Sequence, residues 1–82
     1  MANWTIVQAK RDFDNGLFKA FRIDRTMGGW VVALQGSGKL GEGFLLDARN
    51  KEPRVFKSVN GAVSTLGKIG FQVDSIGYIF KV

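Results

Sequence analysis

Short apolar runs separated by turn-forming residues restrict the fold of this chain most strongly. Glycine, asparagine, aspartate or proline stands between one run and the next, and these residues let the backbone reverse direction. Runs rich in aromatic and β-branched residues between such turns are typical of β-strands. The candidate strands are residues 4–7, 17–25, 30–35, 44–47 and 54–57.

Two of these runs show which side chains share a face. In residues 17–25, Phe21 and Ile23 fall on one face and Arg22 falls on the other, which predicts a half-buried strand. Residues 30–35 are apolar on both faces. This second pattern is typical of a strand in the middle of a sheet or beneath a helix.

Clear helical spacing occurs once, after Ser58. Ser58 can cap free amide groups, apolar residues follow at helical intervals up to Ile69, and Gly70 suits a helix end. Alternation returns in residues 76–82 and predicts a C-terminal strand. The chain is therefore expected to be one α+β domain over residues 1–82, with a curved antiparallel sheet of four to six strands packed against one helix at about residues 58–69. A domain this short buries little surface by itself, so we expect a homodimer.

Cysteine and histidine are both absent. Their absence excludes disulfide bonds, thiolate nucleophiles, cysteine-ligated zinc and the Ser-His-Asp arrangement. The aspartates are scattered through turns and strand faces, and their spacing does not predict paired carboxylates in a cleft. We therefore expect no catalytic residues, no metal site and no cofactor, and we expect the protein to bind a partner rather than to act as an enzyme.

Two loops have a ligand-binding alternative. Residues 36–39, Gly-Ser-Gly-Lys, match part of a phosphate-binding loop, but that motif needs glycine where Ala33 stands and serine or threonine where Leu40 stands. Residues 12–16 match part of a calcium loop but lack its distal glutamate. A hairpin loop and a simple turn explain the two segments without a ligand.

The N-terminal residues lack the basic start and long apolar stretch of a signal peptide. No later segment is apolar over the length of a membrane span. We therefore expect a cytoplasmic protein without a membrane partner.

An excess of basic residues is the main functional signal. Twelve lysines and arginines against seven acidic residues give a formal charge of +5, which favours polyanionic partners. Aromatic residues interleave with the cations, and exposed aromatics beside cations bind single-stranded nucleic acids by base stacking and phosphate neutralisation. If neighbouring strands align their outward side chains, Arg22, Arg54 and either Lys39 or Lys51 form a strip that faces phosphates. The candidate nucleic-acid-binding residues are Lys19, Arg22, Arg25, Trp30, Lys39, Lys51, Arg54 and Lys57, with Phe18 as a second stacking candidate.

The order of elements around residues 29–34 and 54–66 resembles known nucleic-acid-binding modules. The first segment is the expected central strand, and the second is a basic strand that leads into the helix. This arrangement is similar to the PC4-like (Whirly-type) single-stranded DNA-binding proteins, to the three-strand-and-helix arm domains of phage integrases, and to short accessory proteins of plasmids and phages. The resemblance to PC4-like proteins implies a dimer and a DNA-binding sheet face, although a strand after the helix is not part of their pattern.

Two functions follow as hypotheses. The first is a non-catalytic module that binds nucleic acid, either single-stranded DNA or RNA, through a basic strand face with exposed aromatics. The second is a protein-interaction or inhibitor module that binds a host protein by adding residues 76–82 to another sheet edge, or through an apolar face. The structural alternative for the first is that Trp30 and Phe56 belong to the core and that the charges form a solvated face.

Overall fold

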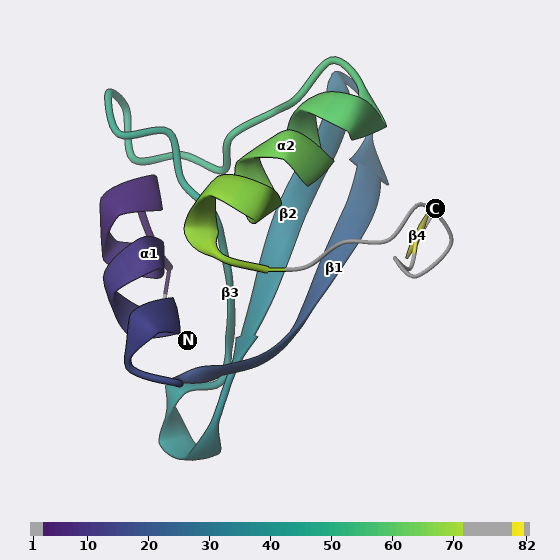
Figure 1. The fold of residues 1–82 in the computed structure, drawn as a ribbon. Coiled ribbons are helices and arrows are strands. Elements are labelled where there is room, and N and C mark those ends of the chain that lie inside the picture. The colour runs from purple at the N-terminus through teal and green to yellow at the C-terminus, as the bar shows by residue number, and fades with distance from the viewer. Residues whose placement is uncertain (1–2, 72–79, 82) are drawn as a thin grey trace.

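The structure is a computed structural model that describes residues 3–71 and 80–81 of the 82-residue chain. The helices pack against a small sheet (Figure 1). In chain order the elements are α1 (Ile6–Asp14), β1 (Phe18–Thr26), β2 (Gly29–Gly36), the 3-10 helix η1 (Gly38–Leu40), β3 (Glu42–Phe44), α2 (Val59–Ile69) and β4 (Phe80–Lys81).

β2 is the central strand of the antiparallel part of the sheet. β1 and β2 form a hairpin whose last pair is Thr26 with Gly29, and β3 pairs with the other edge of β2. The two residues of β4 pair in parallel with β1, so the strand order is β3-β2-β1-β4. A register shift between Phe18 and Ala20 marks a β-bulge, which turns Phe18 towards the core together with Phe21.

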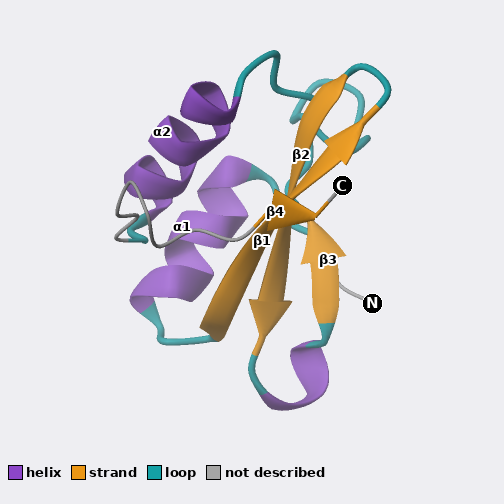
Figure 2. Cartoon of the chain, turned by 90° about the vertical axis from the view of Figure 1, so that its right-hand side faces the viewer, coloured by secondary structure: helices purple, strands orange, loops and turns teal. Residues whose placement is uncertain are grey.

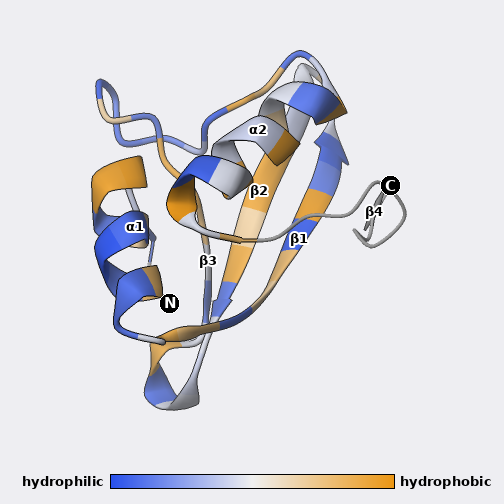
Figure 3. Cartoon of the chain, in the orientation of Figure 1, coloured by the Kyte–Doolittle hydropathy of each residue, from blue (hydrophilic) through white to orange (hydrophobic). Residues whose placement is uncertain are grey.

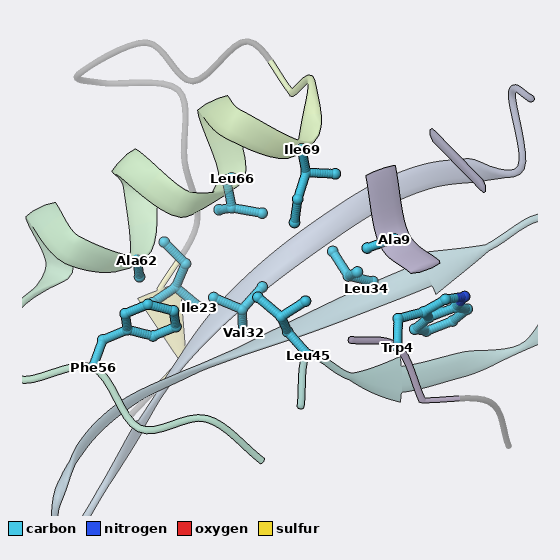
Figure 4. Close-up of a cluster of buried hydrophobic side chains, with 10 residues drawn as sticks. All are labelled: Trp4, Ala9, Ile23, Val32, Leu34, Leu45, Phe56, Ala62, Leu66 and Ile69. Atoms are coloured by element: carbon cyan, nitrogen blue, oxygen red, sulfur yellow. The ribbon is translucent and has the colours of Figure 1, made fainter. Parts of the chain in front are cut away.

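The core lies between the sheet and the two helices, which cover the same face of the sheet (Figure 2). Ile23 of β1, Leu34 of β2 and Leu66 of α2 are fully buried and belong to one cluster (Figure 4). Burial of one such side chain stabilises the fold by about 1.5–3 kcal/mol. Figure 3 shows the corresponding pattern, with a mostly hydrophobic β2 and a mostly hydrophilic α1.

The α+β class and the helix after Ser58 are confirmed. Ser58 Oγ accepts a hydrogen bond from Gly61 N–H at the start of α2, and Gly70 ends the helix at φ 136°. The antiparallel sheet, however, has three strands within the described residues rather than four to six, and it packs against two α-helices rather than one. No helix among the described residues has the length and apolar character needed to cross a membrane.

The predicted strand at residues 4–7 is wrong, because α1 begins there. Thr5 Oγ1 accepts a hydrogen bond from Gln8 N–H, and the Gln8 side-chain oxygen accepts one from Thr5 N–H. This reciprocal cap contributes about 1 kcal/mol and outweighs the β-propensity of the run. Trp4 alone keeps a strand contact, as an isolated bridge to Leu45.

Residues 44–47 and 54–57 also fall short of full strands, which explains the smaller sheet. Phe44 ends β3, and the next contacts are isolated bridges, such as Leu46 with Pro53 and Trp30 with Phe56. Of the predicted C-terminal strand, residues 76–79 and 82 lie outside the described residues, and only Phe80–Lys81 is assigned, as β4.

Candidate nucleic-acid interface

A backbone pair between Trp30 and Phe56 joins the start of β2 to the extended segment before α2. Trp30 N–H donates to the Phe56 carbonyl oxygen at 2.8 Å, and Phe56 N–H donates to the Trp30 carbonyl oxygen at 2.7 Å. On the other side of β2, Arg25 of β1 is the direct partner of Trp30. Neighbouring strands lie about 4.8 Å apart, so three chain segments meet within about 10 Å at this end of the sheet.

An arginine lies over each of the two paired aromatic rings. Arg25 Cζ is 5.6 Å from the centroid of the Trp30 ring, and Arg54 Cζ is 5.2 Å from the centroid of the Phe56 ring. Cation–π contacts at exposed sites contribute about 0.5–1 kcal/mol, so they favour these guanidinium positions. Both rings pack against the core while both arginines are exposed. Each buried or partly buried ring therefore helps to fix the position of an arginine side chain at the surface.

Gly29 allows the two segments to come this close. Its φ is 146°, which L-residues rarely adopt, and a Cβ built on it would lie 2.2 Å from the Phe56 carbonyl oxygen. Any side chain at this position would push the segment of Phe56 away from β2. Gly29 is thus required for the pairing of Trp30 with Phe56 as well as for the close of the hairpin.

Two apolar side chains are exposed beside the arginines. Met27, in the turn between β1 and β2, is fully exposed, and Val55 is about half exposed. Val55 lies over the hairpin turn, because a Cβ on Gly28 or Gly29 would be 3.6 or 3.2 Å from Val55 Cγ1. We call the surface formed by Arg25, Met27, Arg54, Val55 and the exposed Lys57 the hairpin-end surface.

Within the part of the chain that the structure describes, the cations of the hairpin-end surface have no close carboxylate partner. Among the described residues, none of Arg25, Arg54 and Lys57 has an acidic oxygen within the 4.0 Å of an ion pair. Arg54 does affect one acidic group, Asp47. The pKa of Asp47 is lowered mainly by a hydrogen bond from the Arg49 backbone N–H. Desolvation opposes this effect, and the charges of Arg49 and Arg54 add to it. The hairpin-end surface therefore stays cationic.

Arg22 is placed differently, on the face of the sheet opposite the helices. Its Nε donates to both carboxylate oxygens of Asp24, at 2.8 and 3.0 Å, and its two terminal nitrogens donate to Glu42, at 2.7 and 3.2 Å. These hydrogen bonds, that of Asp24 first, raise the pKa of Arg22 above its usual value. The three side chains together carry more negative than positive charge, so they do not form a phosphate-binding surface.

The remaining basic candidates lie away from the hairpin-end surface. Lys19 and Lys39 are at the other end of the sheet, where the start of β1 meets the end of β2. Arg25 is six positions after Lys19 along the strand, which is about 20 Å. Lys51 belongs to the loop at residues 47–53, drawn far to the left of the hairpin turn in Figure 1. The structure brings together Arg25, Trp30, Arg54 and Lys57 but does not form the expected strip of Arg22, Arg54 and Lys39 or Lys51.

The two residues expected to stack on bases are partly buried. Trp30 packs against the core beneath Arg25. The Phe18 ring meets Trp4 edge-on at a centroid distance of 4.8 Å, and lies 6.0 Å from the Phe71 ring. At least part of each ring is therefore covered by other side chains of the protein and is not free to stack on a base.

Of the two segments with a ligand-binding alternative, only residues 36–39 form a connection; the simple turn expected at residues 12–16 is wrong for residues 12–14, which form the end of α1. Asp12 and Asp14 lie in α1, and Asp12 accepts a hydrogen bond from Trp4 Nε1 at 2.9 Å. Residues 36–39 run from the end of β2 into η1 and so form the link between two antiparallel strands, as the hairpin interpretation predicted. Over residues 3–71 and 80–81, acidic side chains do not gather in groups of three that could hold a metal ion.

Sequence reading missed the exposed apolar part of the hairpin-end surface. Met27 lies between the candidate strands 17–25 and 30–35, and an apolar side chain in a turn between two strands is a detectable signal of exposure. Val55 was read as a strand residue. Its exposure depends on the single bridge at Phe56, which sequence alternation does not reveal.

No protein-family model matches this chain, and no curated protein or solved structure is significantly similar to it. The resemblance to PC4-like proteins and to integrase arm domains therefore stays a prediction. Evidence about function comes from the geometry and charge of the chain itself.

Proposed function

We propose that this protein is a non-catalytic nucleic-acid-binding module and that the hairpin-end surface contacts the nucleic acid. The observation that supports this most directly is the meeting of Arg25, Arg54 and Lys57 at one end of the sheet, without ion-pair partners among the described residues. Two of these cations are held over aromatic rings. Ordered arginines bind phosphate with less loss of side-chain entropy than free ones.

The charge arrangement gives an expected salt dependence. Each phosphate contact releases counterions, so three contacts with B-form DNA predict a slope of about −2.7 for log affinity against log salt. Affinity should then fall about 40-fold when salt rises fourfold. The net charge of +5 adds to the rate of encounter with a polyanion.

The test is a titration of fluorescently labelled oligonucleotides, followed by anisotropy at two salt concentrations. The double variant Arg25→Gln with Arg54→Gln should reduce the slope by about two units, because two phosphate contacts are lost. The matched control is Lys19→Gln with Lys39→Gln, which removes the same charge from the other end of the sheet. It should leave the slope nearly unchanged.

Two results would reject the proposal. One is the absence of saturable, salt-sensitive binding to any nucleic acid. The other is an equal loss of binding in both double variants, since this would mean that only the net charge matters. Circular dichroism of the variants provides the check on folding.

A protein-interaction module is the second candidate, favoured by the exposed Met27 and Val55. Strand addition is the less suitable mode, because the outer edge of β1 pairs with β4 and Trp4 N–H donates to the Phe44 carbonyl at the edge of β3. The suitable mode for a protein partner is instead contact with the exposed side chains of Met27 and Val55. A stoichiometric protein retained after nuclease treatment, and lost on Met27→Ser, would favour this candidate. The homodimer expected from the chain length also stays a prediction, which sedimentation equilibrium can test.

A further inference from the structure

The hairpin-end surface offers cations but no flat stacking surface. Within residues 3–71 no aromatic side chain is exposed, and the large exposed apolar residues there are Val7, Met27 and Val55. Proteins that hold single strands depend on stacking between aromatic rings and bases, which contributes about 1–3 kcal/mol per base. The described surface therefore suits a ligand whose bases are already stacked on one another.

The shape of the hairpin end fits a groove. β1 and β2 form a two-stranded ribbon that closes at the pair Thr26–Gly29, so only Met27 and Gly28 form its tip. The major groove of B-form DNA, about 12 Å wide, accepts a two-stranded ribbon. Gly28 adds no side chain, so Met27 is the ribbon's own side chain at the tip, and Val55 of the segment paired with β2 lies beside it.

The depth of the groove also agrees with the position of the cations. Arg25 is two residues behind Met27, which is about 7 Å along the strand. The major groove is about 8.5 Å deep. With Met27 at the base edges, Arg25 would lie near the rim, where the phosphates are. Arg54 and Lys57, on the segment paired with Trp30, lie beside the same end of the ribbon.

We infer that the hairpin end docks in the major groove of double-stranded B-form DNA, with Met27 against base edges and Arg25, Arg54 and Lys57 on the flanking phosphates. This rests on the proposed nucleic-acid function and narrows it to the DNA duplex. The face of the sheet opposite the helices is not the contact surface, because Arg22 there is neutralised by Asp24 and Glu42. An A-form RNA duplex does not fit, since its major groove is too narrow for side chains to reach the bases.

The experiment compares one sequence in three forms: duplex DNA, duplex RNA and single-stranded DNA, at equal salt, by anisotropy titration. Duplex DNA should bind most tightly. Met27→Ser should weaken binding to duplex DNA about tenfold, the effect of burying roughly half of a methionine side chain. It should not change binding to single-stranded DNA. Val7→Ser is the matched control, because Val7 is also exposed and apolar but lies on α1.

Chemical footprinting identifies the groove. Dimethyl sulfate methylates guanine N7 in the major groove and adenine N3 in the minor groove. The inference predicts protection of N7 by the wild-type protein, reduced by Met27→Ser and unaffected by Val7→Ser. Protection confined to adenine N3 would overturn it.

The remaining outcomes separate this inference from the proposed function. Equal or tighter binding to single-stranded DNA or duplex RNA would overturn the inference and leave the proposed function standing. An unchanged affinity of Met27→Ser for duplex DNA would do the same. Failure of all three forms to bind would overturn both, and a Met27-dependent protein complex found instead would favour the protein-interaction module.

Discussion

Replacement of Gly29 by alanine should separate the two segments that build the hairpin-end surface. Gly29 has a φ of 146°, and its added Cβ would stand 2.2 Å from the Phe56 carbonyl oxygen. The backbone strain costs about 1–3 kcal/mol. Relief of the clash lengthens the two hydrogen bonds between Trp30 and Phe56, each worth about 1 kcal/mol. We therefore expect the free energy of unfolding to fall by about 3–5 kcal/mol.

Urea unfolding followed by tryptophan fluorescence measures this change. A thermal melt gives a second reading. In a domain of this size each kcal/mol of stability corresponds to about 4–8 °C in Tm, so the Tm of Gly29→Ala should be lower by about 20 °C. The control is Gly28→Ala, whose Cβ would meet only Val55 Cγ1 at an ordinary 3.6 Å. It should change the free energy of unfolding by less than about 1 kcal/mol. Equal stability of the two alanine variants would refute the explanation.

Three further predictions concern other parts of the fold. Gly70→Ala should lower the free energy of unfolding by about 3 kcal/mol, because the φ of Gly70 is 136° and the added Cβ would lie 2.5 Å from the ring of Phe13. Gly67→Ala, which has open space around it in α2, should instead raise the free energy of unfolding by about 0.5–1 kcal/mol, and thermal melts of the two variants measure both changes. Arg22→Met should lower the free energy of unfolding by about 1 kcal/mol at low salt and by less at high salt, since the ion pairs of Arg22 are partly solvated. The same variant should reduce nucleic-acid affinity far less than Arg25→Gln does. The pKa of Asp47 is lowered in the folded protein, so its ionised form stabilises the fold above the ordinary aspartate pKa, and this stabilisation is lost as pH falls through the pKa of the folded state. Asp47→Asn should therefore reduce the loss of stability towards acid pH. An equal loss of stability in the wild type and the variant would contradict this.

Much of the fold could be predicted from local sequence. Ser58 and the apolar spacing up to Ile69 predicted α2 because a cap and one apolar face are local properties of a helix. The alternation around Ile23 likewise placed Arg22 on the face away from the core. α1 was missed because Trp4 and the β-branched residues after it favour a strand, while the cap between Thr5 and Gln8 favours a helix.

The candidate site could be predicted only in part, because it depends on contacts between distant residues. The charge and the basic residues were visible, but their grouping required the pairing of Trp30 with Phe56 and the backbone angle of Gly29. Arg22 was an equally good candidate by sequence. Its exclusion depends on Glu42, which lies on another strand, 20 positions later in the chain.

An NMR titration of the isotope-labelled protein with a short DNA duplex tests the central claim most directly. Binding at the hairpin-end surface predicts that amide shifts change at residues 25–29 and 54–57 and that those of Lys19 and Lys39 stay in place. Shift changes concentrated around Lys19 and Lys39, or spread evenly over the basic residues, would contradict it.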